Sequence, residues 1–94
     1  MIGVLTHHWA KEKRFEKARH ILDRNGAAQS RAPGFINRTT LLSKNNPSQI
    51  SSLVIWENDE IYDQWKASPE RAKAMKNADS MWSQPPISER FDIP

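Results

Sequence analysis

The sequence predicts a single ferredoxin-like α+β domain over residues 1–94, with elements in the order β-α-β-β-α-β. Short runs rich in β-branched and aromatic residues alternate with segments in which apolar residues recur every three or four positions. Each change between the two kinds of segment coincides with a turn or a helix-capping signal. This order is typical of a four-stranded antiparallel sheet with the helices on one face.

The first half of the chain is predicted to form a strand, a helix and a second strand. Residues 1–9, MIGVLTHHW, have apolar side chains at both odd and even positions, so both faces of this strand are expected to be buried. Residues 10–29 have an apolar helical stripe, although Asn25-Gly26 could end the helix early. After an Ala-Pro-Gly loop, residues 35–43 alternate as a strand and lead into a hairpin.

The stretch that follows joins a strand to two helices with very short connections. The run LVIW is predicted to end a buried third strand. Asn58 or Asp59 is expected to cap the next helix, and acidic residues fall in its first turn, where the helix dipole favours them. Ser68-Pro69 predicts a second helix start, with serine as the N-cap and proline at the first helical position.

The remaining residues are predicted to form the rest of this helix and an edge strand. Met75 and Trp82 fall on one helical stripe, so the helix is expected to continue to Trp82 and to stop at Pro85-Pro86. Residues 87–93 then form a short strand suited to an edge or an intersubunit position. Because the helices would cover one face of the sheet only, a homodimer is expected to cover the other face.

Composition limits the expected partners and compartment. The chain has 14 basic and 11 acidic residues, a net charge of +3 and no cysteine. The charges are interspersed rather than clustered in a basic stripe, so no nucleic-acid partner is predicted. The lack of cysteine excludes disulfides and thiolate chemistry. No long apolar run or leader-like segment is present, so no membrane partner is expected and a cytoplasmic location is predicted.

Three short motifs give a more specific indication. APGF at residues 32–35 precedes the second strand, WE at 56–57 closes the third, and the pattern Y-x-x-W-x-x-S starts at Tyr62. Together with the element order, they resemble the antibiotic biosynthesis monooxygenase superfamily over nearly the whole chain. This resemblance implies a dimeric α+β barrel. The superfamily includes cofactor-independent oxygenases that act on polycyclic phenols, haem-degrading enzymes, and members with no known activity.

The haem-degrading branch of the superfamily has a strand asparagine, a helix tryptophan and a histidine on the following helix at its pocket. Trp65 matches the tryptophan. The asparagine is replaced by His7, or by Thr6 with a one-residue shift. The histidine would be expected near Met75, and none occurs after His20. We therefore predict neither a haem cofactor nor a metal ion, and a haem-binding relative is the weaker alternative.

Two adjacent histidines on the first strand are the first candidates for chemistry. Neighbouring strand residues point to opposite faces, so His7 and His8 cannot form a two-histidine metal site within one chain. His7 has the parity of Leu5, and the register implied by the resemblance turns it towards the helices and the pocket, with His8 facing the barrel interior. A neutral imidazole in the pocket could act as a general base; a hydrogen-bonded histidine in the core or interface is the alternative.

Four further side chains are candidates for the pocket wall. Trp65 offers an aromatic ligand a flat face and one N–H donor, and Tyr62 and Met75 are predicted to lie near it. Core packing is the alternative for these three. Asn37 and Arg38 are the polar residues of an otherwise apolar and threonine-rich strand, so one of them must point inward or to an interface. Asn37, which shares the parity of the strand's first residue, is predicted to orient the substrate.

These residues predict a small-molecule pocket of the monooxygenase type. Molecular oxygen would react with an aromatic or phenolic substrate that His7 deprotonates, Trp65 stacks against and Asn37 orients, without a bound cofactor. The alternative is a non-catalytic small-molecule-binding or stress-associated homodimer whose pocket is shallow or filled by its own tryptophans. No pattern typical of nucleotide binding, zinc peptidases or serine hydrolases is present.

Overall fold

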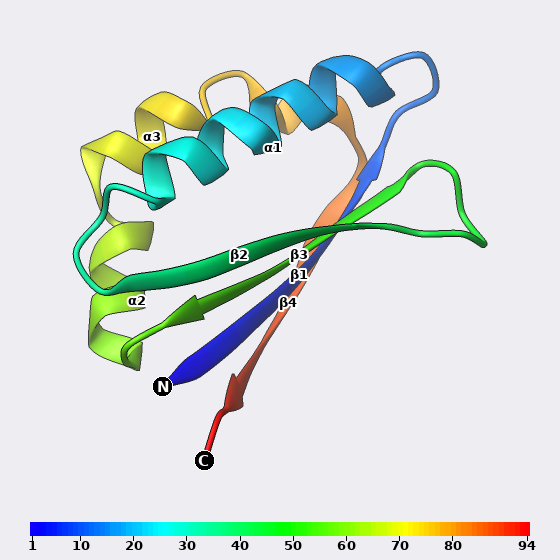
Figure 1. The fold of residues 1–94 in the computed structure, drawn as a ribbon. Helices are drawn as coiled ribbons and strands as arrows, with labels where there is room; N and C mark the ends of the chain where they lie inside the picture. The colour runs from blue at the N-terminus through cyan, green and yellow to red at the C-terminus, as the bar shows by residue number, and fades with distance from the viewer.

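The computed structural model describes all of residues 1–94. In chain order, its elements are β1 (Ile2–Ala10), α1 (Phe15–Gln29), β2 (Phe35–Leu42), β3 (Gln49–Trp56), α2 (Asp59–Lys66), α3 (Pro69–Ala74), the 3-10 helix η1 (Ala78–Met81) and β4 (Trp82–Asp92). The strands form one four-stranded antiparallel sheet in the order β2-β3-β1-β4. In Figure 1, α1 and α3 cover one face of this sheet and the other face is bare. The predicted α+β ferredoxin-like fold is confirmed.

The core lies between the sheet and the helices and depends on the even-numbered residues of β1 and β3. Val4 and Val54, partners in the β1–β3 ladder, are 2% and 3% exposed. Beside them, Trp56 and Trp65 belong to the same buried cluster, while Ile50 packs with residues of α1 and η1 in a second cluster. Consecutive strand residues point to opposite faces, so the odd-numbered residues of both strands face away from the helices.

Local capping interactions start α2 and α3 where the sequence predicts them. The Asn58 side chain accepts a hydrogen bond from the Ile61 backbone N–H at 2.9 Å. The Ser68 hydroxyl accepts one from the Arg71 N–H at 3.1 Å, with Pro69 at the first helical position. These bonds satisfy backbone donors that have no partner within the helix. The second helix therefore starts almost directly after the first.

Helix α1 starts later than predicted and continues through Asn25-Gly26, where the sequence could have ended it. It begins at Phe15 rather than Ala10, after a turn in which Lys13 has a left-handed φ of 66°. Gly26 lies inside the helix, which ends at Gln29. The alternative in which Asn25-Gly26 ends the helix is therefore wrong, and tertiary contacts override the low helix propensity of glycine.

The prediction that a helix continues to Trp82 is wrong. α3 ends at Ala74, Asn77 has a left-handed φ of 68°, and β4 already begins at Trp82. Pro85 and Pro86 therefore lie inside an edge strand rather than after a helix. The pairing of β4 with β1 shifts opposite these prolines, which have no N–H to donate to the ladder. None of the helices is both long and apolar enough to cross a membrane.

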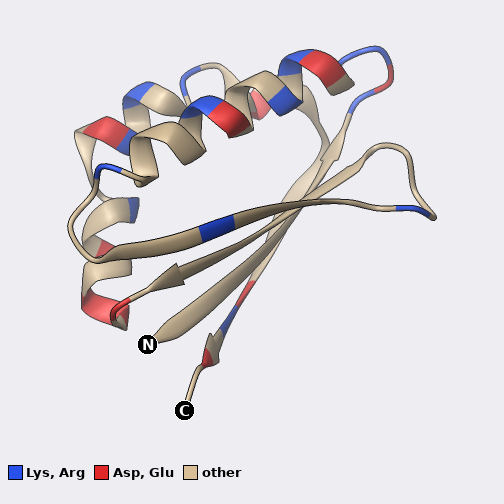
Figure 2. Cartoon of the chain, in the orientation of Figure 1, with Lys and Arg blue, Asp and Glu red and all other residues tan.

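The bare face of the sheet is largely apolar. Leu41, Ile87 and Phe91 are 44%, 59% and 43% exposed on this face. Strands β1 and β3 have no charged residue, and most of the charges lie on the helices and loops (Figure 2). A large exposed apolar patch on a small domain typically marks an interaction surface.

Candidate functional site

A cavity of about 340 Å³ lies between the sheet and the helices. Its floor combines the polar side chains of Thr6, His8 and Ser52 with the apolar ones of Val4 and Val54, all from β1 and β3. All three helices and the edge strand β4 contribute to its walls. A concave site with a few convergent polar groups is the usual form of a small-molecule pocket.

His8, rather than His7, faces this cavity. The residue is 8% exposed, and the centroid of its ring lies 4.5 Å from that of Trp82. Its Nδ1 atom is buried without a hydrogen-bond partner. Burial, followed by the positive charges of Arg38, Arg71 and His7, lowers the pKa of His8 from 6.5 to about 4. His8 is therefore a neutral imidazole at neutral pH, with one buried ring nitrogen that makes no hydrogen bond.

The prediction that His7 faces the helices, with His8 on the opposite side, is wrong. The His7 Nδ1 lies 2.6 Å from Ser51 Oγ and 3.3 Å from Gln49 Nε2 on the bare face. Both faces of β1 carry apolar residues, so the alternation in the sequence could not decide which parity faces the helices. The contacts of His7 match the alternative of a hydrogen-bonded histidine.

Asn37 is exposed on the bare face, so the prediction that it lines the pocket is also wrong. The pairing of β2 with β3 shifts between Phe35, which pairs with Trp56, and Asn37, which pairs with Ile55. Such an irregularity adds a residue to one strand and reverses the alternation beyond it. Arg38 consequently points inward and lines the cavity. The sequence required one of the two polar residues to point inward, and the shift in register decides which.

Trp65, Tyr62 and Met75 all lie in the wall of the cavity. Trp65 is 4% exposed, and its ring stacks on that of Trp56 with 6.1 Å between centroids. The Tyr62 ring lies 5.8 Å from that of Trp56, and burial raises the pKa of its phenol. These contacts belong to the core as well as to the cavity, so the roles of the three residues in substrate binding stay predictions.

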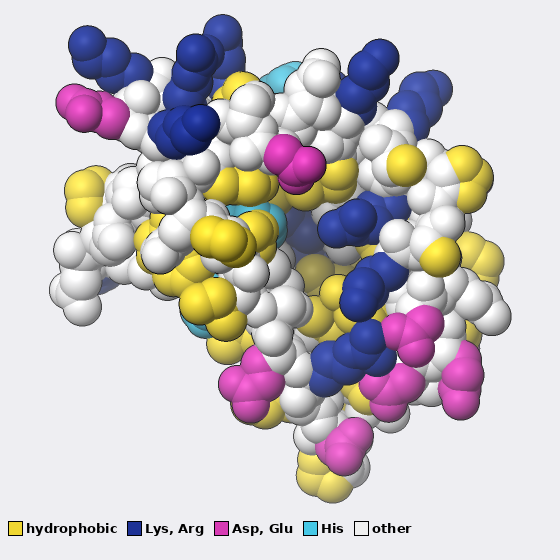
Figure 3. Space-filling view, turned by 180° about the vertical axis from the view of Figure 1, so that it is seen from behind, with side chains coloured by type: hydrophobic (Ala, Val, Ile, Leu, Met, Phe, Trp, Pro, Cys, Tyr) yellow, Lys and Arg dark blue, Asp and Glu magenta, His cyan; other side chains and the backbone are white.

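The cavity is electropositive. Figure 3 shows Lys and Arg side chains gathered around a hollow in the molecule. The basic residues that line the cavity are Arg38, Lys66, Arg71 and Arg90. Asp79 is the only acidic residue that lines it. Arg90 is paired with Asp59 at 2.9 Å and with Asp63 at 2.6 Å. This feature is not evident from the sequence because the basic residues come from separate elements, and the charged Arg38 within a strand is its only local signal.

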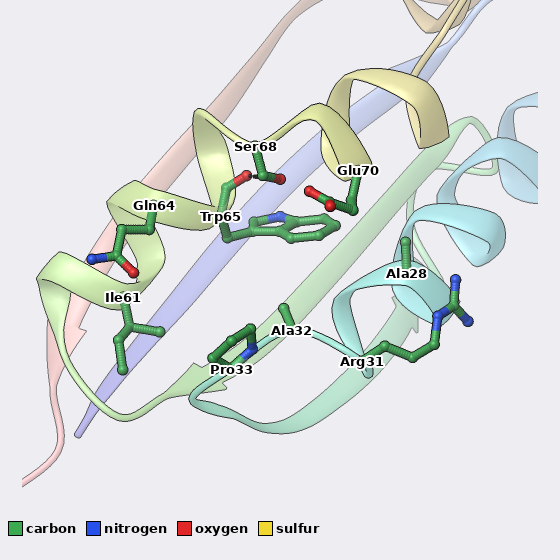
Figure 4. A pocket seen from close by; sticks show the side chains of 9 residues that line it. All are labelled: Ala28, Arg31, Ala32, Pro33, Ile61, Gln64, Trp65, Ser68 and Glu70. Carbon is green, nitrogen blue, oxygen red and sulfur yellow. Dashed lines mark hydrogen bonds between the residues drawn. The ribbon is translucent and has the colours of Figure 1, made fainter.

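A second cavity of about 290 Å³ lies between α2, α3 and the loop that follows α1. Ala28, Ala32 and Ile61 are among the apolar residues that line it. Figure 4 shows the Trp65 ring between Glu70 and Ala32 in this space. Trp65 is the one residue that lines both cavities.

The larger cavity does not fit the haem-binding arrangement of the haem-degrading branch. The residue near the expected histidine position is Met75, and His8 is the only histidine that lines the cavity. No three His, Asp or Glu side chains come together in a way that could hold a metal ion. The residues present therefore do not supply the helix ligand on which that arrangement depends.

Several solved structures share this fold at low sequence identity. SnoaB, a cofactor-independent oxygenase from Streptomyces nogalater, has a TM-score of 0.86 at 13% identity, over 99% of this chain and 92% of that one. Rv0793 from Mycobacterium tuberculosis has a TM-score of 0.88 at 11% identity, over 99% and 94% of the two chains. A conserved protein from Methanosarcina mazei Go1 has a TM-score of 0.88 at 13% identity, over 96% and 89%. At these identities the likeness shows the fold alone.

The sequence comparisons give one match. No curated protein matches the chain. The family model for antibiotic biosynthesis monooxygenases matches residues 1–77, which span β1 to α3 and include His8, Arg38, Trp65 and Arg71. The matched part contains most of the residues around the larger cavity. The chain therefore belongs to the antibiotic biosynthesis monooxygenase family.

Proposed function

We propose that this protein oxidises a small aromatic or phenolic molecule with molecular oxygen, without a bound cofactor. The observation that carries the proposal is His8, a buried imidazole with an unpartnered Nδ1, whose residue lines the same cavity as Trp65. The indole suits an aromatic ring, and the imidazole nitrogen suits its hydroxyl group. Family membership and the fold shared with SnoaB, a cofactor-independent oxygenase, support the reaction class.

The positive charges around His8 favour the deprotonated substrate. With a pKa of about 4, His8 is too weak a base to hold the proton of a phenol at neutral pH. Arg38 and Arg71 instead lower the pKa of the bound phenol by stabilising the phenolate, while His8 hydrogen-bonds the substrate. The electron-rich phenolate then reacts with oxygen. One oxygen atom ends in the carbonyl of a quinone, and the other leaves as water with two substrate hydrogens.

Oxygen consumption with a panel of phenols, naphthols and hydroquinones tests this proposal. Replacing His8 with glutamine is expected to lower kcat/KM about 10- to 100-fold, the cost of one hydrogen bond to a charged group. H7Q is the matched control, because His7 occupies the neighbouring position on the opposite face of β1. Equal losses in the two variants, or no oxygen uptake with any compound of the panel, would contradict the proposal.

A non-catalytic binding protein is the second candidate function. The weakness of His8 as a base favours it, because a cavity can hold a phenol without activating it. Phenols that quench the tryptophan fluorescence but cause no oxygen uptake would support this second function over the first.

We also propose that two copies of the chain pack through the bare faces of their sheets. Ile87 and Phe91 of β4 lie on this face, next to His7 and Gly3 of β1. Both side chains are large, apolar and more than 40% exposed, at 59% and 43%. Burying such a surface against its own copy would stabilise a domain that is small for a single core.

Replacing Ile87 with lysine is expected to convert the dimer into a monomer, because the interface would bury an unpaired charge. Light scattering over a range of protein concentrations measures this change. A27K is the matched control, because Ala27 is an exposed position on α1, away from the sheet. A monomeric wild type, or an I87K variant that dimerises as well as A27K, would disprove this interface.

A further inference from the structure

The geometry points to a substrate that carries a carboxylate on its hydroxylated ring, with the carboxylate bound by the guanidinium groups of Arg38 and Arg71. This inference rests on the proposed function, because both place the ligand in the cavity lined by His8 and Trp65. Three observations support it: neither arginine has an anionic partner, α1 makes room for one of them, and the cavity is small.

Arg38 is a partly buried cation without a carboxylate partner. It is the only charged residue of β2, seen as the blue segment of that strand in Figure 2. Its Nη1 donates to Gln29 Oε1 at 2.7 Å and its Nη2 to the Leu22 carbonyl oxygen at 3.3 Å. These bonds use two of the five guanidinium N–H groups. Asp23, the one carboxylate whose charge acts favourably on Arg38, forms its salt bridge with Arg19 instead. A buried charge without a counter-ion is costly, and an anionic ligand would remove that cost.

Gly26 makes room for the Arg38 side chain. A Cβ atom at this position of α1 would lie 2.7 Å from Arg38 Nε and 2.8 Å from its Cδ, closer than packed atoms approach. Glycine inside a helix costs about 1 kcal/mol relative to alanine. Asn25 and Gln29 of α1 also line the cavity, at 7% and 5% exposure, and Asn25 Oδ1 has no partner. This side of α1 is therefore shaped for a polar site rather than for an apolar core.

Arg71 brings a second unmatched charge to the same region. It lines the cavity from the first turn of α3, which Ser68 caps, and it forms no salt bridge. The charges of Arg38 and Arg71 both lower the pKa of His8, so both act on the space beside its ring. Arg90, in contrast, has two carboxylate partners. Arg38, Arg71 and Lys66 are therefore the basic residues of the cavity without a carboxylate partner, and of these three only the two arginines act on His8.

These groups together indicate the class of ligand. A guanidinium binds a planar carboxylate through two parallel hydrogen bonds. A carboxylate is therefore the anionic group that the two arginines of the cavity are best suited to bind. His8 and Asn25 line the cavity and each has a buried polar atom without a partner, and a ring hydroxyl can donate as well as accept a hydrogen bond. The volume of about 340 Å³ is near the lower end for ligand pockets, which favours a single ring. Hydroxybenzoates combine these features.

Binding measured under nitrogen tests this inference separately from any reaction. Calorimetry compares gentisate, a dihydroxybenzoate, with hydroquinone, which is the same ring without the carboxylate. We expect gentisate to bind at least about tenfold more tightly than hydroquinone, because one hydrogen bond to a charged group contributes about this much affinity. R71Q is expected to remove most of this preference, and G26A to reduce it by displacing the Arg38 side chain. R19Q is the matched control, because the exposed Arg19 pairs with Asp23.

Circular dichroism and urea denaturation show that each variant is folded. Equal affinities of the wild type for gentisate and hydroquinone would overturn the inference, as would an R71Q variant that keeps the preference. Inorganic phosphate and benzoate can also be compared as competitors of gentisate. Stronger competition by phosphate would overturn the assignment of a carboxylate.

The result can be separated from the proposed oxidation. Arginine-dependent binding of gentisate without any oxygen uptake would support the inference and contradict the proposed function. Oxidation of hydroquinone with no preference for gentisate would support the function and overturn the inference.

Discussion

Replacing Trp56 with alanine is expected to lower the free energy of unfolding by about 3–5 kcal/mol. Trp56 is 0% exposed, and its ring lies 5.8, 5.8 and 6.1 Å from the rings of Phe35, Tyr62 and Trp65. These neighbours come from β2 and α2, so they cannot all move to fill the cavity left by the indole. Since small domains are stable by roughly 5–15 kcal/mol, urea denaturation should show a large shift of the midpoint.

W56F is the matched variant for this experiment. The Trp56 Nε1 is buried without a hydrogen-bond partner, so phenylalanine loses volume but no hydrogen bond. We expect W56F to lose less than half as much stability as W56A. A loss below about 1 kcal/mol in W56A would show that the aromatic cluster is not a main source of stability.

Lowering the pH from neutral to about 4 is expected to destabilise the fold by about 3 kcal/mol through His8 alone. The pKa of His8 is lowered from 6.5 to about 4, first by burial and then by the charges of Arg38, Arg71 and His7. Between these values the unfolded chain binds a proton that the folded protein does not. The stability is therefore fully present above pH 6.5 and is lost as the pH falls towards 4.

Comparison with H8Q isolates this contribution, because the carboxylates that titrate at low pH act in both proteins. Urea denaturation at a series of pH values should show the wild type losing stability more steeply than H8Q as the pH falls below neutral. Parallel curves for the two proteins would show that His8 is not held neutral by its surroundings.

Local interactions made much of the fold predictable from the sequence. The caps at Asn58 and Ser68 bind backbone groups three residues further along, so they act before any tertiary contact forms. The end of the second helix could not be predicted in the same way. The apolar side chains of Ala78 and Trp82 continue a helical spacing, yet they reach the same buried cluster through a 3-10 turn and a strand.

The candidate site was predicted only where helical periodicity decides the direction of a side chain. Trp65 and Tyr62 lie three residues apart on α2, and both reach the cavity. The strand residues were assigned to the wrong faces. His8 faces the cavity instead of His7, and Arg38 faces it instead of Asn37. The arginines that make the cavity electropositive belong to elements far apart in the sequence. No local sequence pattern therefore predicts that they line one cavity.

The sequence by itself determined the order of the elements, their caps and the motifs that relate the chain to its family. Each of these depends on residues that are close together in the chain. Only the tertiary structure decided which face of β1 turns towards the helices. It also decided which polar residue of β2 points towards the same side of the sheet. A strand with apolar residues on both faces can be buried either way, so packing against α1 makes the first choice. The register shift near Phe35 makes the second choice, and together they bring His8 and Arg38 into one cavity.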